Sequence, residues 1–218
     1  MSYRAVLFDL DGTLLNTLPD LADATNYALQ AMGFPERSMD EVRRFVGNGV
    51  GNLIARAVPC GTSSQKTEET LAVFRAYYQE HAVEKTAPYE GILEMLQALS
   101  GAGLRMAVVS NKFDAAVKAL NARFFYPMIS TAIGETPQIS RKPAPDSVFA
   151  AMRELGVEKE DCVYVGDSEV DVETARNAGI PCIGCAWGFR GRELLEVCGA
   201  ACVIDDPSEL TDMLVGDT

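Results

Sequence analysis

Short apolar runs alternate with helix-patterned segments along most of this chain, and this alternation restricts the fold more than any other feature. Six runs have the length and composition of buried strands: residues 5–9, 104–110, 128–134, 162–167, 181–186 and 201–205. After the second run, helical periodicity covers residues 113–124, 145–155, 170–178, 191–197 and 207–214. Strands that alternate with helices form a parallel sheet with helices on both faces. We therefore predict an α/β fold with a Rossmann-like, doubly wound parallel sheet.

Residues 17–85 interrupt the alternation, because they contain no convincing strand. Four segments in this interval have helical periodicity, at residues 20–32, 38–46, 51–58 and 67–83. Ser38, followed by Glu41, has the spacing of a capping box. We therefore expect a small all-helical domain, residues 17–85, inserted after the first strand of an α/β core that comprises residues 1–16 and 86–218.

The composition excludes several classes of function. The net charge of −12 disfavours nucleic acid as a partner, because phosphate backbones attract basic surfaces. Hydrophobic residues make up 48% of the chain, yet no apolar run has the length of a membrane helix. The first residues enter a strand pattern at once and do not have the layout of a signal peptide. We expect a cytoplasmic protein, either monomer or homodimer, with no membrane partner.

The cysteines allow two interpretations. Cys182 and Cys185, followed by Cys198 and Cys202, resemble the spacing of zinc ligands. However, the first two lie in a short apolar run that is typical of a buried strand, where cysteine behaves as a small hydrophobic residue. The core interpretation is favoured over the zinc site. Disulfides are not expected in a cytoplasmic chain.

Polar residues that can carry chemistry stand where the predicted strands end. In parallel sheets ligands bind at the carboxyl ends of the strands, and three of the runs end in Asp9, Ser110 and Asp167. Asp9 and Asp11 point to the same side of an extended segment. The chemical interpretation is a nucleophile, Asp9, and a general acid/base, Asp11. The alternative is an ordinary Asp-Gly turn at a strand end.

Four polar residues are candidates for binding or supporting a phosphate or a metal. Ser110 can donate to a phosphate oxygen, or it can cap the following helix. Lys142 precedes a proline, which restricts its backbone and would aim its ammonium at a phosphoryl oxygen, although lysines in loops are more often exposed. Asp167 fits as a Mg²⁺ ligand, and Asp171 as a supporting acid or as the partner of Ser168 in a helix cap.

A glycine-rich loop lies between two predicted helices of the insert. Gly47, Asn48 and Gly49 form either a turn between helices or a set of backbone N–H donors for an anionic ligand. His81 is the only histidine of the chain, and it has no partner nearby in sequence. It is therefore interpreted as a surface residue.

The segments DLDGTLLNT, VVSNK, RKPAPD and VGDSEVDVETARNAG, in this order, resemble the motifs of the haloacid dehalogenase-like phosphatases. The resemblance covers nearly the whole chain and includes the insert, which is similar to the small cap of that superfamily. Within the superfamily, FVGNGVGNLIARAV and AWGFRGRELLE resemble the phosphoglycolate phosphatase branch. One departure is Phe113, which stands where a proline is frequent.

The resemblance implies a Mg²⁺-dependent phosphatase that acts on a small phosphorylated metabolite through a phospho-aspartate. Asp9 would be nucleophile and metal ligand, Asp11 would be the acid/base and bind the metal through its backbone carbonyl, and Asp167 would complete the metal set. Ser110 and Lys142 would hold the phosphate group, and Asn111 would contribute near the phosphate through its backbone.

Several alternatives remain open beside this function. A phosphomutase or a pyrophosphatase uses much the same core, and the sequence does not determine the substrate, although the resemblance favours 2-phosphoglycolate. A phospho-accepting signalling domain also combines acids, Mg²⁺ and a lysine on a parallel sheet. That class is disfavoured, because it has no use for a helical insert of this length.

Overall fold

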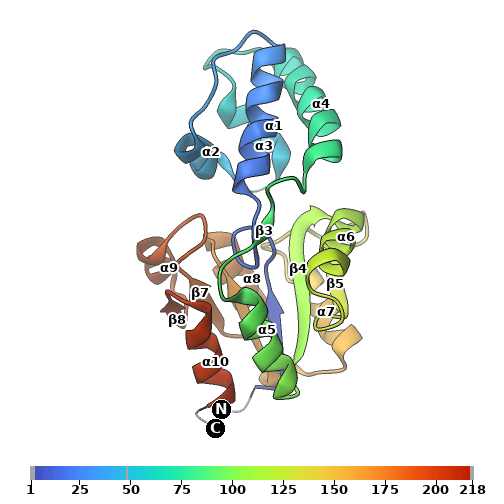
Figure 1. Cartoon of the computed structure of the whole chain (residues 1–218), viewed down its shortest axis with the longest axis vertical. Helices are drawn as coiled ribbons and strands as arrows, with labels where there is room; N and C mark the ends of the chain where they lie inside the picture. The colour runs from blue at the N-terminus through green and yellow to red at the C-terminus, as the bar shows by residue number, and fades with distance from the viewer. Residues whose placement is uncertain (1–2, 48, 217–218) are drawn as a thin grey trace. The chain divides into compact units, whose positions relative to one another are not determined.

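The structure, a computed structural model, describes residues 3–47 and 49–216. It separates into two compact units, which we call the sheet unit (Met1–Leu15 with Pro88–Thr218) and the helical unit (Asn16–Ala87) (Figure 1). The domain boundaries predicted from the sequence fall at residues 16 and 86. The assignment of the two units as catalytic core and cap stays a prediction.

The sheet unit contains a parallel sheet of six strands in the order β5-β4-β1-β6-β7-β8. These strands are β1 Ala5–Phe8, β4 Arg105–Phe113, β5 Thr131–Glu135, β6 Cys162–Gly166, β7 Cys182–Cys185 and β8 Cys202–Ile204. All six predicted strands are present, so the predicted α/β fold is confirmed. Because β1 pairs with both β4 and β6, the strand order reverses at β1, and this reversal is where doubly wound sheets bind ligands.

Helices cover both faces of this sheet. They are α5 Ile92–Gly101, α6 Asp114–Phe124, α7 Asp146–Leu155, α8 Glu169–Ala178, α9 Arg192–Cys198 and α10 Pro207–Val215, with a 3₁₀ turn at Lys159–Asp161. One apolar cluster packs α7, α8 and α9 against the buried side chains of β1, β4 and β6. Figure 1 shows α5, α6 and α10 over the other face. Helix α5 was not predicted, although Ile92, Met95, Leu96 and Leu99 are buried with helical spacing.

The helical unit contains the four helices expected from periodicity: α1 Leu18–Ala31, α2 Met39–Phe45, α3 Val50–Ala57 and α4 Ser64–His81. The capping box at the start of α2 is confirmed, since the Ser38 backbone N–H donates to Glu41 Oε2 (2.8 Å) and the Glu41 N–H donates to Ser38 Oγ (3.3 Å). Strands β2 Leu15–Asn16 and β3 Ala87–Pro88, which were not predicted, pair where the chain passes between the units.

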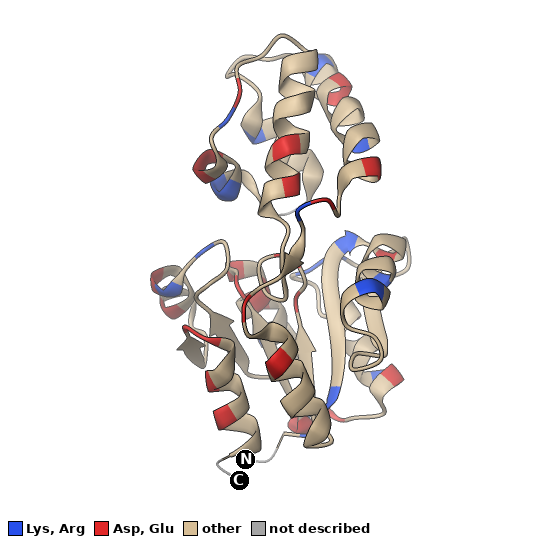
Figure 2. Ribbon diagram, viewed as in Figure 1, with Lys and Arg blue, Asp and Glu red and all other residues tan. Residues whose placement is uncertain are grey.

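The distribution of charge and hydrophobicity agrees with the composition. Acidic residues occur along helices of both units, interspersed with lysines and arginines (Figure 2). Among the described residues, no helix combines the length and the apolar character that a membrane span requires. Cys182 and Cys185 are buried in β7, as the core interpretation of these cysteines predicted.

A buried carboxylate joins the two ends of the helical unit. Asp20, in the first turn of α1, is only 3% exposed, and its oxygens accept hydrogen bonds from the backbone N–H groups of Lys85 (2.9 Å) and Thr86 (2.8 Å). Asp23 lies nearly one turn later and contacts the Lys85 ammonium (2.6 Å), but its side chain is 41% exposed. Asp20 thus satisfies one buried and one partly buried backbone donor, whereas the contact of Asp23 is a surface ion pair.

We expect Asp20→Ala to lower the free energy of unfolding by about 1–3 kcal/mol, because it leaves buried N–H groups without an acceptor. Asp23→Ala is the matched control and should cost about 0–1 kcal/mol, as exposed ion pairs do. Urea denaturation of the full chain measures both values. Equal losses in the two variants would contradict a special role for Asp20.

Candidate active site

Three neighbouring strands bring the predicted site residues to one edge of the sheet. Asp9 directly follows β1, Ser110 lies near the end of β4, and Asp167 directly follows β6. All three side chains are buried, although each is polar. Since β1 pairs with β4 and with β6, the carboxyl ends of these strands adjoin one another. The strand order, and not proximity in sequence, therefore assembles the site.

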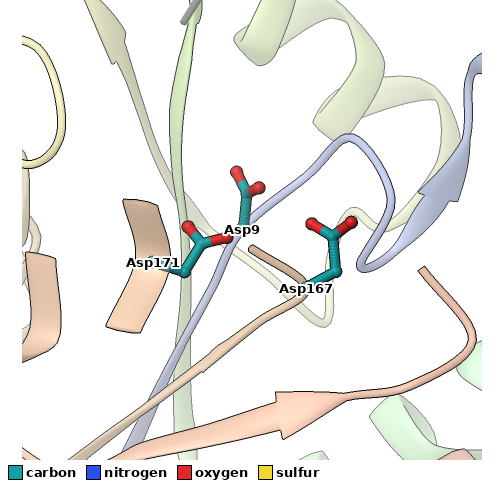
Figure 3. Close-up of side chains that lie close together, drawn as sticks. All are labelled: Asp9, Asp167 and Asp171. Carbon is teal, nitrogen blue, oxygen red and sulfur yellow. The ribbon is translucent and has the colours of Figure 1, made fainter. Parts of the chain in front are cut away.

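Three buried carboxylates form a cluster at this edge. Asp9, Asp167 and Asp171 each offer an oxygen, and these oxygens lie within 4.8 Å of one another. Figure 3 shows Asp9 beside the end of β1, Asp167 beyond β6 and Asp171 on the first turn of α8, with the side chains gathered together. Acids this close repel one another unless cations compensate their charge.

Lys142 supplies one compensating charge from a loop, so it is not an exposed lysine. Its side chain is 4% exposed. The ammonium lies 2.8 Å from Asp9 Oδ1 and 2.7 Å from Asp171 Oδ1, and it also contacts Tyr164 Oη (3.0 Å) and the Val109 carbonyl (3.2 Å). This single cation is shared by two of the three acids.

The Asn111 side chain holds the backbone of Lys142 in place. Its Oδ1 accepts from the Lys142 N–H (2.7 Å), and its Nδ2 donates to the Lys142 carbonyl (3.0 Å). The resemblance implied only that the Asn111 backbone lies near a phosphate, so this side-chain role is an addition. The loop that carries Lys142 is thereby attached to strand β4.

The burial of these charges shifts their pKa values. Burial, reinforced by the Asp171 charge and opposed by Lys142, raises the pKa of Asp9 to about 7. Burial also raises the pKa of Asp167 well above its usual range, with Asp171 and Asp9 adding to the effect. Burial opposes the charge of Lys142, but Asp171 and Asp9 together hold the pKa of its ammonium well above the usual value. Three acids share one cation, so negative charge is left uncompensated when the acids are ionised.

This excess and the donor set fit a divalent cation with a preference for oxygen ligands, such as Mg²⁺. Contacts within the described part of the chain use one oxygen of Asp9 and one of Asp167, whose Oδ2 accepts from the Phe189 N–H (2.7 Å). Asp171 differs, because its Oδ1 accepts from Lys142 and Tyr164 while its Oδ2 accepts from the Ser168 N–H and hydroxyl. It therefore acts both as a helix-cap partner and as a support for Lys142.

Asp11 lies apart from this cluster and has its own cation. Lys112 Nζ lies 2.9 Å from Asp11 Oδ1, and the two side chains are 14% and 21% exposed. Lys112 was missed in the sequence, although its position two residues after Ser110 in an extended strand places both on the same side. Tyr164 was also missed, and nothing in its sequence context indicates a contact with Lys142.

Two glycines allow loops from distant parts of the chain to pack on Asp167. A Cβ at Gly12, where φ is +91°, would overlap the Asp167 carboxylate. A Cβ at Gly188 would overlap both Asp167 and the Gly12 carbonyl. Side chains at either position would displace a proposed metal ligand.

The glycine-rich loop of the helical unit lies between α2 and α3. Gly47 and Gly49 have φ values of +122° and +86°, and Asn48 lies outside the described residues. Arg56 Nη1 donates to the carbonyls of Phe45 (2.8 Å) and Gly47 (3.4 Å), which ties the loop to α3. The role of this loop in substrate binding stays a prediction. His81 contacts Glu84 (2.6 Å), so the prediction that it has no partner nearby in sequence is wrong, but the contact is exposed, in agreement with a surface residue.

Comparison with known proteins identifies the family. Residues 6–185 match the family model of the haloacid dehalogenase-like hydrolases. A phosphoglycolate phosphatase of Pseudomonas savastanoi pv. phaseolicola is 38% identical over 220 residues, which cover 95% of this chain and 78% of the relative. An N-acetylmuramic acid 6-phosphate phosphatase of Pseudomonas aeruginosa is 33% identical over 216 residues, which cover 98% of this chain and 96% of the relative.

A solved structure shows that the similarity includes the fold. The crystal structure of a candidate phosphoglycolate phosphatase from Lactobacillus delbrueckii subsp. bulgaricus is 35% identical and has a TM-score of 0.94, with both chains covered completely. The resemblance drawn from the four motifs is thereby confirmed. This chain belongs to the haloacid dehalogenase-like hydrolase family, in which it is a phosphoric monoester hydrolase similar to phosphoglycolate phosphatases.

Proposed function

We propose that this chain is a Mg²⁺-dependent phosphatase that hydrolyses small phosphate monoesters, with 2-phosphoglycolate as the favoured substrate, through a phospho-aspartate. The observation that carries the proposal is the position of Asp9, a buried carboxylate held by Lys142 beside Asp167, with a second acid two residues later. Relatives named phosphoglycolate phosphatase, at 35–38% identity over most of this chain, support the substrate.

In the first step Asp9 attacks phosphorus while the bond between phosphorus and the ester oxygen breaks. Asp11 gives its proton to that oxygen, so the leaving group departs as a neutral alcohol. In the second step the Asp11 carboxylate takes a proton from water, whose oxygen attacks the phosphoryl group. The bond to Asp9 breaks, and inorganic phosphate and the free carboxylate are restored.

The other residues of the site hold the phosphoryl group and balance charge. We assign Ser110 and Asn111 to the phosphoryl oxygens, with the Lys142 ammonium offsetting the charge that collects around Asp9. Asp9, Asp167 and the backbone carbonyl of Asp11 would hold Mg²⁺, which when bound draws negative charge from the nucleophile and from the phosphoryl oxygens. Asp171 acts through its contact with Lys142 and is a positioning residue.

The helical unit is proposed to act as a cap that excludes water from the site. Gly47, Asn48 and Gly49 are proposed to aim backbone N–H groups at the non-phosphate end of the substrate. A cytoplasmic location and a monomeric or homodimeric state belong to the same proposal.

A second candidate substrate is N-acetylmuramic acid 6-phosphate. It is favoured by one observation: the relative of that name is 33% identical to this chain, and the two cover each other almost completely. Phosphomutase and pyrophosphatase activities on the same core are further alternatives.

A panel of phosphate compounds tests the proposal. We expect the purified chain to release phosphate from 2-phosphoglycolate with the highest kcat/KM, and to stop when EDTA removes the metal and resume with Mg²⁺. The panel includes N-acetylmuramic acid 6-phosphate, pyrophosphate and an aryl phosphate. A folded protein that releases no phosphate from any ester with Mg²⁺ present would contradict the proposed function. A higher kcat/KM for pyrophosphate than for every ester would assign the chain as a pyrophosphatase instead.

A further inference from the structure

The site contains two lysines, and their surroundings differ. Lys142 is shared by Asp9 and Asp171 and also contacts the Tyr164 hydroxyl and a backbone carbonyl. These contacts hold its ammonium beside Asp9, the proposed nucleophile. Lys112 pairs instead with Asp11, and the 2.9 Å contact is largely withdrawn from solvent. Water therefore screens the attraction between Lys112 and Asp11 less than it screens a surface ion pair, so Lys112 influences the proposed acid/base.

The position of Lys112 places it on the leaving-group side of the reaction. An acid that protonates the ester oxygen must come within hydrogen-bond distance of that oxygen, and the proposed mechanism gives this task to Asp11. Lys112 Nζ contacts the same carboxylate. In the proposed mechanism it would therefore lie beside the atoms that follow the ester oxygen in the substrate. Its backbone N–H donates to Ser110 Oγ (3.2 Å), which ties it to the phosphate side as well.

Because of this contact, Lys112 and the leaving group compete for the same oxygen of Asp11. While Lys112 binds Asp11 Oδ1, that oxygen is occupied by an ammonium and not by the leaving group. A substrate with an anionic group next to its ester oxygen gives Lys112 a second partner of the same charge as Asp11. A substrate without that group leaves the ion pair as it is, because moving an ammonium from a partly buried carboxylate without replacement is costly.

We propose that Lys112 is a specificity-determining residue that binds a carboxylate adjacent to the ester oxygen, so that the enzyme selects phosphate esters of α-hydroxy acids. This inference rests on the proposed phosphatase function and deepens it. In 2-phosphoglycolate the carbon that bears the ester oxygen also bears the carboxylate. In N-acetylmuramic acid 6-phosphate the carboxylate is attached through a different ring carbon, away from the phosphate ester.

The test compares two esters that differ only in this group. 2-Phosphoglycolate and ethyl phosphate have the same two-carbon chain, with a carboxylate in one where the other has a methyl group. We expect the unmodified enzyme to prefer 2-phosphoglycolate, and Lys112→Met to reduce the ratio of the two kcat/KM values by roughly 10- to 100-fold, as loss of a charge-assisted hydrogen bond does. Lys112→Arg should keep most of the preference.

Controls separate this role from folding and from general loss of activity. Lys118→Met removes a lysine of α6 that is 61% exposed and pairs with Asp114, and it should leave the ratio unchanged. Inhibition by inorganic phosphate should persist in Lys112→Met, which shows that the phosphate site is intact. Equal losses for both esters in Lys112→Met would overturn the inference, because Lys112 would then only orient Asp11.

Two further outcomes are informative. An unmodified enzyme that hydrolyses both esters without preference for 2-phosphoglycolate overturns the inference while the phosphatase function stands. An unmodified, folded enzyme that hydrolyses neither ester overturns the proposed function itself, and the inference falls with it.

Discussion

Asp9→Asn is expected to lower turnover by about 10⁴-fold or more, because an amide oxygen is a poor nucleophile toward phosphorus. The substitution keeps the size of the side chain and an oxygen that can accept from Lys142, so the fold should survive. Steady-state release of phosphate measures the effect. Mass spectrometry of enzyme quenched during turnover should show a phosphorylated species in the unmodified protein and none in the variant.

A matched control for this variant is Asp161→Asn. Asp161 precedes β6 at the opposite edge of the same sheet and contacts Arg4 (3.6 Å). Its substitution should leave turnover unchanged. If Asp9→Asn retained an appreciable steady-state rate while Asp161→Asn behaved normally, the covalent mechanism would be wrong.

Lys142→Met is expected to have the largest effect on stability, about 3–5 kcal/mol in metal-free protein, because it leaves the buried carboxylates of Asp9 and Asp171 without their cation. Turnover should also be lost, since the ammonium is proposed to offset charge around the nucleophile. Denaturation in EDTA measures the first effect. Lys159→Met, which removes an exposed partner of Glu160, is the control and should cost about 0–1 kcal/mol.

A double-mutant cycle measures the interaction between Lys142 and Asp9 directly. In Asp9→Asn/Lys142→Met one of the two carboxylates has already been neutralised, so the combined loss of stability should be smaller than the sum of the single losses. Strict additivity would mean that Lys142 does not stabilise Asp9 through their contact. The pair would then be close in space without sharing an interaction.

The sequence predicted the sheet better than it predicted the contacts within the site. Apolar runs and helical spacing are local signals, and they correctly placed Asp9 and Asp167 where strands end, whereas β4 continues beyond Ser110 to Phe113. The contact of Tyr164 with Lys142 depends on which strands are neighbours and which way a loop folds back. No local pattern contains that information.

Asp171 shows a second limit of sequence analysis. Its spacing from Ser168 suggested a helix cap, and its place in the motif suggested a supporting acid. In the structure one oxygen serves Ser168 and the other serves Lys142, so the two interpretations are compatible. Short motifs cannot separate roles that a single side chain performs together.

The central position of β1 has a consequence for the synthesis of the protein. Ala5–Phe8 is synthesised long before its partners in β4 and β6, which begin only at Arg105 and Cys162. The strand therefore has two unpaired edges for much of translation, a condition that favours aggregation. The helices of the helical unit are made next and contact one another locally, so they can fold during this wait. A chain that stops before residue 167 carries Asp9 but neither Asp167 nor Asp171, so the carboxylate cluster can form only after residue 171 has been made.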